Sequence, residues 1–169
     1  MNVRVATQGD AAAVRDLLAG VYREGGAFVG DGPEGVNALA ARIGAPSDRS
    51  FYAVAVEGAM LAGWLELHRS PAARLEHVAV LTLAVAPEAR RRGAARALLG
   101  AGYAWCRRAG VLKVALHVRA GNLAAIRLYE SEGFTLEGRE TRQVRRLPSE
   151  GGGFEDNLLM GKWLAGPPG

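Results

Sequence analysis

Residues 81–99, LTLAVAPEARRRGAARALL, decide the fold of this chain. The apolar run before Pro87 has no charged residue from His77 onward and is too short to cross a membrane, so it predicts a buried strand. Pro87 ends the strand because proline has no N–H to donate to a ladder. From Ala94 onward, small and apolar residues recur at helical spacing. The stretch therefore predicts a strand, a basic turn and a helix.

The turn, RRRGAA at residues 90–95, has the chemistry of an anion site. The first N–H groups of a helix have no intrahelical partner and carry a partial positive charge. The small residues Gly93, Ala94 and Ala95 would let a phosphate approach this backbone, and the arginines add charge. We expect a pyrophosphate cradle here, the alternative being a solvated basic turn. The turn contains neither a dinucleotide fingerprint nor a P-loop.

Two motifs in order along the chain resemble those of the GCN5-related N-acetyltransferase (GNAT) family. The first is V-x-P-x-x-R-x-x-G-x-A at residues 85–95, and the second is N-x-x-A-x-x-L-Y-x-x-x-G-F at residues 122–134. Their spacing also fits, and the likeness extends from Val3 to about Leu164. The resemblance implies that the protein takes acetyl-CoA as its cofactor and transfers the acetyl group to an amine.

Alternation and helical spacing predict the order βααβββαβαββ, a mixed α/β sheet covered by helices. The resemblance makes this the single-domain GNAT fold, with about seven strands, in which strands four and five are parallel and splay apart around the cofactor. The expected strands are 3–6, 51–57, 61–68, 76–85, 113–118, 134–144 and 154–163. The expected helices follow Thr7, span 36–43 and 91–108, and run from a cap at Asn122 to Gly133.

Length and composition favour one globular domain. A chain of 169 residues buries roughly two thirds of its unfolded surface, and we expect an N-acetyltransferase domain over 1–165 with a flexible tail at 166–169. The start has no signal-peptide pattern, so we expect a cytoplasmic protein. A single cysteine excludes an internal disulfide. One cysteine and three scattered histidines also argue against a metal site.

The net charge of +4 suits an anionic cofactor. Aromatic residues make up 7% of the chain and no nucleic-acid-binding motif is present, so we expect neither a nucleic-acid nor a membrane partner. A homodimer is common among look-alikes, and an exposed edge on the C-terminal strand would permit one.

The resemblance assigns the cofactor site residue by residue. Backbone groups in the segment Leu83, Ala84 and Val85 would hold the pantetheine arm and the carbonyl. The pyrophosphate would lie on Arg90 and on the amides of Arg91, Arg92, Gly93, Ala94 and Ala95. Arg96 could reach the 3′-phosphate region or be a solvated helical arginine.

Two further residues match the second motif. Asn122 resembles the asparagine that contacts pantetheine, although asparagine is also a common helix cap. Tyr129 resembles the tyrosine that protonates the leaving thiolate, the alternative being a buried core aromatic. Either residue has a purely structural reading as well.

The acceptor amine must lose a proton before it attacks, since a free lysine amine has a pKa of about 10.4. Many relatives carry a carboxylate on the fourth strand for this purpose, whereas here that strand has none after Glu76. We expect the base to be Glu76 or His77 at the start of this strand, or Glu66 or His68 on the third strand, acting directly or through a water. Glu66 and His68 share one strand face. Alternatively, these are surface residues and solvent takes the proton.

For the acceptor we expect contacts from Glu24 and Phe28, with Asp31, in a glycine-rich segment, and from Asp156 near the C-terminus. Each loop residue has a mobile surface loop as its alternative, and Asp156 could instead pair with an arginine across the strands. The C-terminal pattern resembles bacterial acetyltransferases acting on amino acids, small amines or protein N-termini.

Three functions follow from these features. The leading expectation is an acetyl-CoA-dependent N-acetyltransferase acting on a primary amine of a small molecule or amino acid, by direct attack in a ternary complex. The alternatives are acetylation of a protein N-terminus or lysine, and a non-catalytic CoA-binding sensor module.

Overall fold

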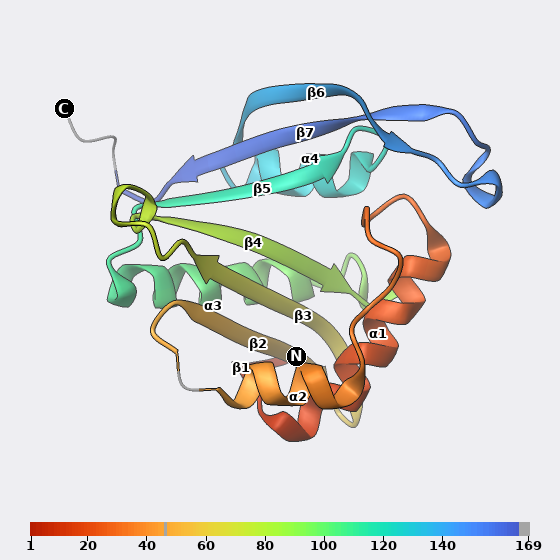
Figure 1. Ribbon diagram of the computed structural model, residues 1–169. Coiled ribbons are helices and arrows are strands. Elements are labelled where there is room, and N and C mark those ends of the chain that lie inside the picture. Colours follow the sequence, from red (N-terminus) through yellow and green to blue (C-terminus); the bar gives the residue numbers. More distant parts are fainter. Residues whose placement is uncertain (46, 166–169) are drawn as a thin grey trace.

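The computed structural model describes residues 1–45 and 47–165, and it confirms the predicted order of elements (Figure 1). The expected tail at 166–169 lies outside the described residues. The strands are β1 (Asn2–Val5), β2 (Ser50–Glu57), β3 (Met60–Arg69), β4 (Val78–Val85), β5 (Lys113–Arg119), β6 (Thr135–Arg145) and β7 (Phe154–Trp163). The helices are α1 (Ala11–Glu24), α2 (Val36–Gly44), α3 (Ala94–Ala109) and α4 (Leu123–Ser131).

The strands form one seven-stranded sheet in the order β1-β2-β3-β4-β5-β7-β6. Strands β4 and β5 are parallel, and the other neighbouring pairs are antiparallel. The expectation of an exposed edge on the C-terminal strand is wrong, because β7 lies between β5 and β6. The edge on that side of the sheet belongs to β6 (Figure 1).

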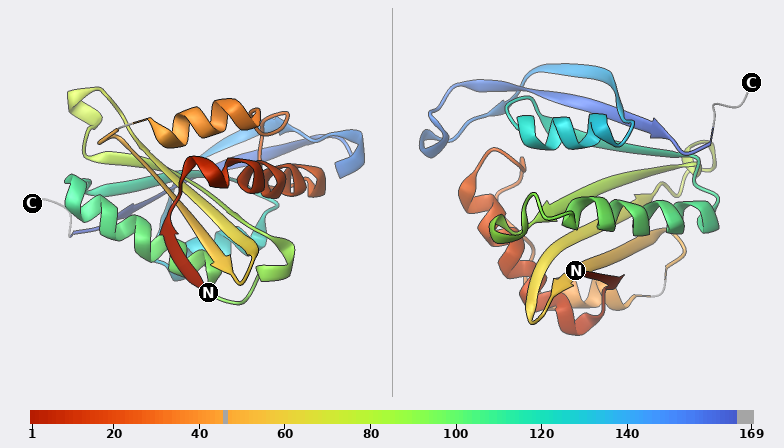
Figure 2. Two further views of the ribbon diagram at one scale, coloured as in Figure 1. Left: turned by 90° about the horizontal axis from the view of Figure 1, so that it is seen from below. Right: turned by 180° about the vertical axis from the view of Figure 1, so that it is seen from behind.

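Helices cover both faces of the sheet, with α1 and α2 on one face and α3 and α4 on the other (Figure 2). Under α1 and α2, the buried Trp64 stacks on Tyr52 with 5.6 Å between ring centroids. Under α3, Leu65 and Leu98 are fully buried. Alternation along β3 supplies both layers, since Trp64 and Leu65 point to opposite faces.

Two predicted boundaries are wrong for backbone reasons. Helix α3 begins at Ala94 rather than Arg91, because Arg91 and Gly93 have positive φ angles of 61° and 88°. These values lie outside the right-handed helical region. Strand β4 begins at Val78 rather than Glu76, because Glu76 ends a short 3₁₀ turn in the αR conformation.

The edge strand β6 is irregular. Its register with β7 shifts between Leu136 and Gly138 and again between Glu140 and Val144. Within the second irregularity Arg142 has a φ of 54°, and its N–H donates to Asp156 at 2.8 Å. Such irregularities bend a strand and increase its twist.

Within the described part of the chain, no helix combines the length and the apolar character that a bilayer crossing requires. The single cysteine, Cys106, is buried in α3, and burial raises the pKa of its thiol to about 11.

Replacing Leu98 by alanine should lower the free energy of unfolding by about 2–5 kcal/mol, because a fully buried leucine leaves a cavity. Urea denaturation measures this. The control is Leu123→Ala, since Leu123 is 57% exposed and should change stability by less than about 1 kcal/mol. Equal losses in the two variants would contradict the assignment of Leu98 to the core.

Candidate functional site

A gap in the sheet defines the candidate site. Strands β4 and β5 pair from Val78–Lys113 to Val80–Ala115 and then separate (Figure 1). Beyond this point β4 stays paired with β3, and β5 stays paired with β7. We call the gap between residues 81–85 of β4 and residues 116–119 of β5 the opening. It confirms the predicted splay of strands four and five.

The backbone of β4 is directed into the opening at alternate residues. Ala86 donates its N–H to the Ala62 carbonyl of β3 at 2.9 Å, which fixes the hydrogen-bonding parity of this antiparallel pair. By that parity Ala84 directs its backbone groups to β3. Leu83 and Val85 direct theirs the other way, into the opening. At the predicted contact residues Leu83 and Val85, the backbone groups therefore have no strand partner on this side, and the Val85 carbonyl accepts from Arg90 instead. The backbone groups of Ala84 are directed to β3.

The turn before α3 presents further backbone donors. Gly93 precedes the helix in the left-handed conformation, and no side chain caps the first turn. The N–H groups of Ala94 and Ala95 therefore have no partner within the helix. A Cβ added at Gly93 would meet nothing within 4 Å, so the space above the turn is open. The segment predicted as the pyrophosphate cradle has the shape of an anion site.

The arginines around this turn bind carboxylates. Arg90 donates to the Val85 carbonyl at 3.3 Å and to Glu24 at 2.6 Å. Arg92 pairs with Glu57 at 2.5 Å, whereas Arg91 is exposed. Exposed ion pairs of this kind contribute little stability, so a phosphate can replace the carboxylates at small cost.

Arg96 joins the two helices that flank the opening. Its guanidinium donates to Glu132 at 3.1 Å and to the Ser131 hydroxyl at 3.0 Å, at the end of α4. The structure therefore places this residue in an ion pair on the protein surface, a partner that neither predicted reading included.

Asn122 precedes α4 and Tyr129 lies within it, on the face of the sheet that α3 shares. Asn122 caps the helix, because its Oδ1 accepts the Ala125 N–H at 3.3 Å. Tyr129 is 7% exposed and packs on Phe134, with 5.5 Å between ring centroids. Burial raises the pKa of Tyr129 above its ordinary value, so the phenol stays protonated at neutral pH.

The two predicted carboxylate bases lie in different places. Glu76 lies beside the joined ends of β4 and β5, where the His77 carbonyl accepts the Leu112 and Lys113 amides. The opening begins beyond Val80, and β4 covers roughly 17 Å between Val78 and Leu83. The structure therefore does not bring Glu76 to the cofactor residues.

Glu66 lies on β3, next to Thr82 of β4, on the face that α1 and α2 cover. It accepts a hydrogen bond from Arg42 at 2.7 Å and lies 3.7 Å from His68. Burial opposes its ionisation, but His68 and Arg42 outweigh this effect and lower the pKa of Glu66. Glu66 is thus an ionised carboxylate held by an arginine.

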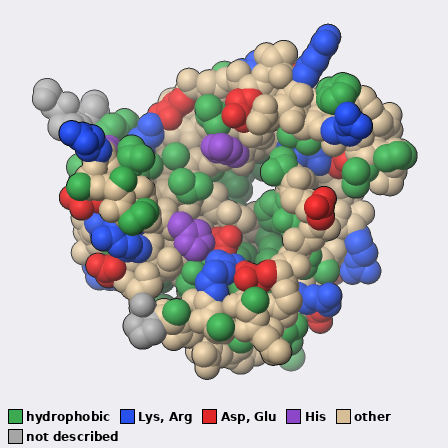
Figure 3. Space-filling view, viewed as in Figure 1, with side chains coloured by type: hydrophobic (Ala, Val, Ile, Leu, Met, Phe, Trp, Pro, Cys, Tyr) green, Lys and Arg blue, Asp and Glu red, His purple; other side chains and the backbone are tan. Residues whose placement is uncertain are grey.

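This face is hollowed between β4 and β5, and basic, acidic and histidine side chains lie around the hollow (Figure 3). The opening therefore reaches both sides of the sheet. The turn before α3 lies on one side, and the ionisable groups of the α1–α2 side lie on the other.

A buried ion-pair cluster that the sequence analysis missed closes one end of this region. Arg119 is 3% exposed and binds Glu150 at 2.6 Å and Glu155 at 2.7 Å. Glu150 also accepts the Gly26 N–H, and Glu155 accepts the Gly121 N–H, each at 2.8 Å. Arg119 thereby joins the end of α1, the β5–α4 turn and the β6–β7 loop.

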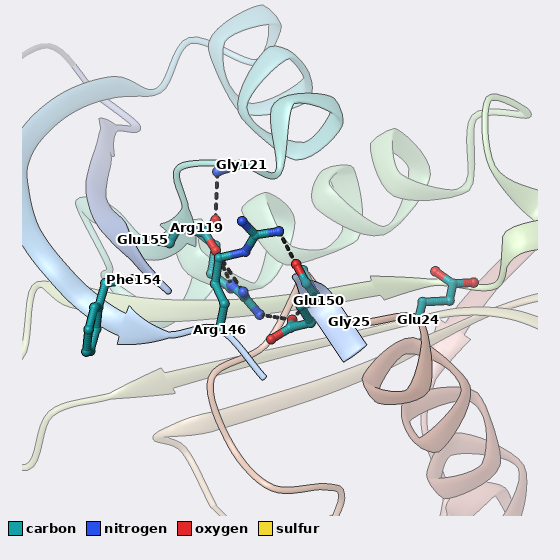
Figure 4. A pocket seen from close by; sticks show the side chains of 9 residues that line it. Glu24, Gly25, Arg119, Gly121, Arg146, Glu150, Phe154 and Glu155 are labelled. Atoms are coloured by element: carbon teal, nitrogen blue, oxygen red, sulfur yellow. Dashed lines mark hydrogen bonds and ion pairs between the residues drawn. The ribbon is translucent and has the colours of Figure 1, made fainter. Parts of the chain in front are cut away.

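A cavity of about 510 Å³ lies beside this cluster (Figure 4). Glu24 and Gly25 line it from the end of α1, and Arg146, Glu150 and Phe154 line it from the β6–β7 segment. This volume is within the usual range for small-molecule pockets.

The predicted acceptor contacts separate in the structure. Glu24 lines the cavity while it pairs with Arg90. Phe28 packs on Tyr22, and its carbonyl accepts from Arg119 at 3.4 Å. Asp156 pairs with Arg139 at 2.6 Å across β6 and β7, which was the structural alternative for this residue.

Comparison with known proteins identifies relatives of the chain. Residues 13–134 match the family described as "Acetyltransferase (GNAT) family". The structure is similar to that of a GNAT-family acetyltransferase from Streptococcus pneumoniae, with a TM-score of 0.86 and 26% identity. That match covers 96% of this chain and 98% of the other.

Two curated relatives match shorter segments. A mycothiol acetyltransferase from Renibacterium salmoninarum is 35% identical over 78 residues, which are 46% of this chain and 23% of the relative. The ribosomal protein bS18-alanine N-acetyltransferase of Escherichia coli is 38% identical over 85 residues, which are 44% of this chain and 57% of the relative. The matches therefore span about a quarter and just over half of these two relatives.

The Arg119 cluster predicts acid sensitivity. The hydrogen bond from Arg119 and the Leu147 and Gly26 amides lower the pKa of Glu150 to about 2. Its folded pKa is below its unfolded value, so its stabilising contribution is complete above about pH 5 and is lost towards pH 2. In Glu150→Gln the unfolding free energy should be lower than in the wild type at pH 7, and the difference should shrink as pH falls.

Urea denaturation between pH 7 and pH 3 measures this difference. The control is Glu130→Gln, which removes an exposed carboxylate from α4. A constant difference between Glu150→Gln and the wild type at all pH values would contradict the ion-pair assignment.

Proposed function

This chain belongs to the GNAT family of acetyltransferases, and from that membership we propose that residues 1–165 form an acetyl-CoA-dependent N-acetyltransferase domain. The acceptor in this proposal is a primary amine on a small molecule or an amino acid. The observation that carries the proposal is the opening, which lies beside the turn before α3 and continues to the opposite face of the sheet.

The residues at the opening fit acetyl-CoA. Acetyl-CoA supplies an acetyl group that is activated as a thioester. The backbone groups of Leu83 and Val85 have no strand partner on the side of the opening and suit an extended amide-bearing arm. Val85 already accepts a hydrogen bond from Arg90 at that position. The unpaired amides of Ala94 and Ala95, with the open space at Gly93, suit a pyrophosphate.

Tyr129 is the proton donor in this proposal. Its buried phenol is protonated at neutral pH and lies on the helix that Asn122 caps beside the opening. A leaving thiol has an ordinary pKa of about 8.5, so proton donation to sulfur at departure favours the products. The Asn122 Oδ1 accepts the capping hydrogen bond, so its Nδ2 group remains able to donate to the pantetheine arm.

A protein N-terminus is the second candidate acceptor. It is favoured by the likeness to ribosomal protein bS18-alanine N-acetyltransferases. The cavity at Arg119 also supports an acceptor larger than a simple amine, because 510 Å³ can hold several atoms beyond the reacting group.

A screen of acceptors tests the function. Thiol release from acetyl-CoA should be measured with amino acids, diamines, alanine-led peptides and lysine peptides, alongside calorimetric titration of acetyl-CoA. Turnover of one acceptor class supports the transferase and identifies the substrate type. Binding without turnover of any amine favours the CoA-binding sensor module, and no binding contradicts the proposal.

Introducing a carboxylate at Gly93 should weaken acetyl-CoA binding. Because any side chain is strained at a φ of 88°, the matched control for Gly93→Glu is Gly93→Gln, which has the same shape without the charge. Calorimetry should show at least about 10-fold weaker acetyl-CoA binding for Gly93→Glu than for Gly93→Gln. Equal affinities in two folded variants would rule out the pyrophosphate position.

Removing the Tyr129 hydroxyl should separate catalysis from binding. In Tyr129→Phe we expect kcat to fall by on the order of 100-fold or more, as for loss of a general acid, with acetyl-CoA affinity nearly unchanged. Steady-state thiol release and calorimetry measure the two quantities. An unchanged kcat at saturating acceptor would contradict the general-acid role and would indicate that Tyr129 serves only as a core aromatic.

A further inference from the structure

The acceptor amine needs a proton acceptor, and His117 is placed to provide one. It lies on β5 two residues beyond Ala115, the last β5 residue that pairs with β4. It therefore borders the opening. By the alternation of β5 its side chain is on the opposite face from the buried Leu116 and Val118, which pack in the core that contains Tyr129.

Tyr129 on α4 and His117 on β5 thus lie on opposite faces of the sheet. Tyr129 is on the α3–α4 face, which also holds the turn at Gly93. His117 is exposed on the α1–α2 face, where the hollow opens (Figure 3). An acid on the cofactor face and a base on the other face match an amine that meets the acetyl group from the opposite side of the sheet.

Other ionisable groups on this face have partners. Glu66 is held by Arg42, and the His68 Nδ1 lies 3.1 Å from the Ser50 hydroxyl. Glu140 accepts from Asn157 at 2.8 Å. By contrast, no hydrogen bond or ion pair within residues 1–45 and 47–165 engages the His117 ring. The imidazole is therefore free to bind an amine.

Apolar and charged side chains surround His117 on this face. Strand β7 places the apolar Leu159 directly opposite, with Asn157 beside it, and β4 contributes Val80 and Thr82 to this face. The charged or titratable groups that share the face come from every neighbouring element. They are Lys113 and Arg119 on β5, Glu155 on β7, Glu140 on β6, Glu66 and His68 on β3, Tyr52 on β2 and Arg42 on α2. Lys113 and Arg119 are themselves paired with carboxylates.

We propose that His117 is the general base of the acetyl transfer, an inference that rests on the transferase function proposed above. A neutral ring nitrogen of His117 accepts one proton from the acceptor ammonium, which leaves a neutral amine. When the C–N bond forms and the C–S bond breaks, the second proton leaves the nitrogen for solvent. Tyr129 delivers its proton to sulfur and then regains one from solvent. His117 passes its proton to solvent, so the net products are an amide, a thiol and one released proton.

The test is the pH profile of kcat/KM in His117→Gln, with the acceptor that the screen identifies. A base must be neutral to accept the amine proton, so the wild-type profile should rise with pH to a plateau. In His117→Gln we expect kcat/KM to fall by on the order of 100-fold at pH 7.5 and the rising limb to move towards the pKa of the amine. Calorimetry should show unchanged acetyl-CoA affinity.

Two comparisons make the test specific. Free imidazole should restore part of the activity of His117→Ala, which a purely structural role would not allow. The control His77→Gln makes the same change where β4 and β5 are joined, and it should retain the wild-type profile.

Three outcomes would overturn the inference while the proposed function stands. The first is a wild-type pH profile of kcat/KM in His117→Gln. The second is a raised KM in His117→Gln with the rising limb of the profile unchanged. The third is loss of the rising limb in Glu66→Gln but not in His117→Gln. A wild-type protein that binds acetyl-CoA but acetylates no amine would overturn the proposed function, and the inference with it.

Discussion

The site depends on the point at which the hydrogen-bond ladder between β4 and β5 ends. Strands β4 and β5 share a parallel ladder only as far as Val80 and Ala115, and beyond it the N–H and C=O groups along one edge of β4 have no strand partner. Buried backbone groups without partners are costly, so an unpaired edge inside a sheet calls for a ligand or water. The neighbouring strands keep their own ladders with β3 and β7. The opening is therefore held rigidly from both sides, and the helices beside it set what can enter.

Local patterns in the sequence predicted most of the fold. Alternation in β2, β3 and β5, the glycine that ends α3 and the asparagine that caps α4 act within a few residues, and each predicted element is present. The errors lie where a backbone conformation is specific to a turn, as at Arg91, or where strand order depends on distant pairing, as for β7. The spacing of residues along one segment carries no information on the backbone conformation of a turn or on the order of strands in the sheet.

The same distinction applies to the site. The turn at Gly93 and the Asn122–Tyr129 helix have local motifs, and the structure brings both to the opening. The Arg119 cluster joins residues more than 30 positions apart, and the pairing of Glu66 with Arg42 joins β3 to α2. Such pairs leave no periodic trace. In the sequence His117 is one exposed position of an alternating strand, and only the strand order of the sheet shows that it lies beside the opening.

The irregular edge strand β6 has a consequence for the behaviour of the protein in concentrated solution. A long, flat edge strand is a template on which another chain can add its own strand and start an aggregate. Here two register shifts interrupt β6, and Arg139, Arg142 and Arg145 are exposed along it. A strand from another molecule could match only short pieces of this edge. It would also meet charged side chains of both signs, because Glu137 is exposed beside these arginines. The edge of the sheet thus resists the self-association that its hydrogen-bonding groups would otherwise invite.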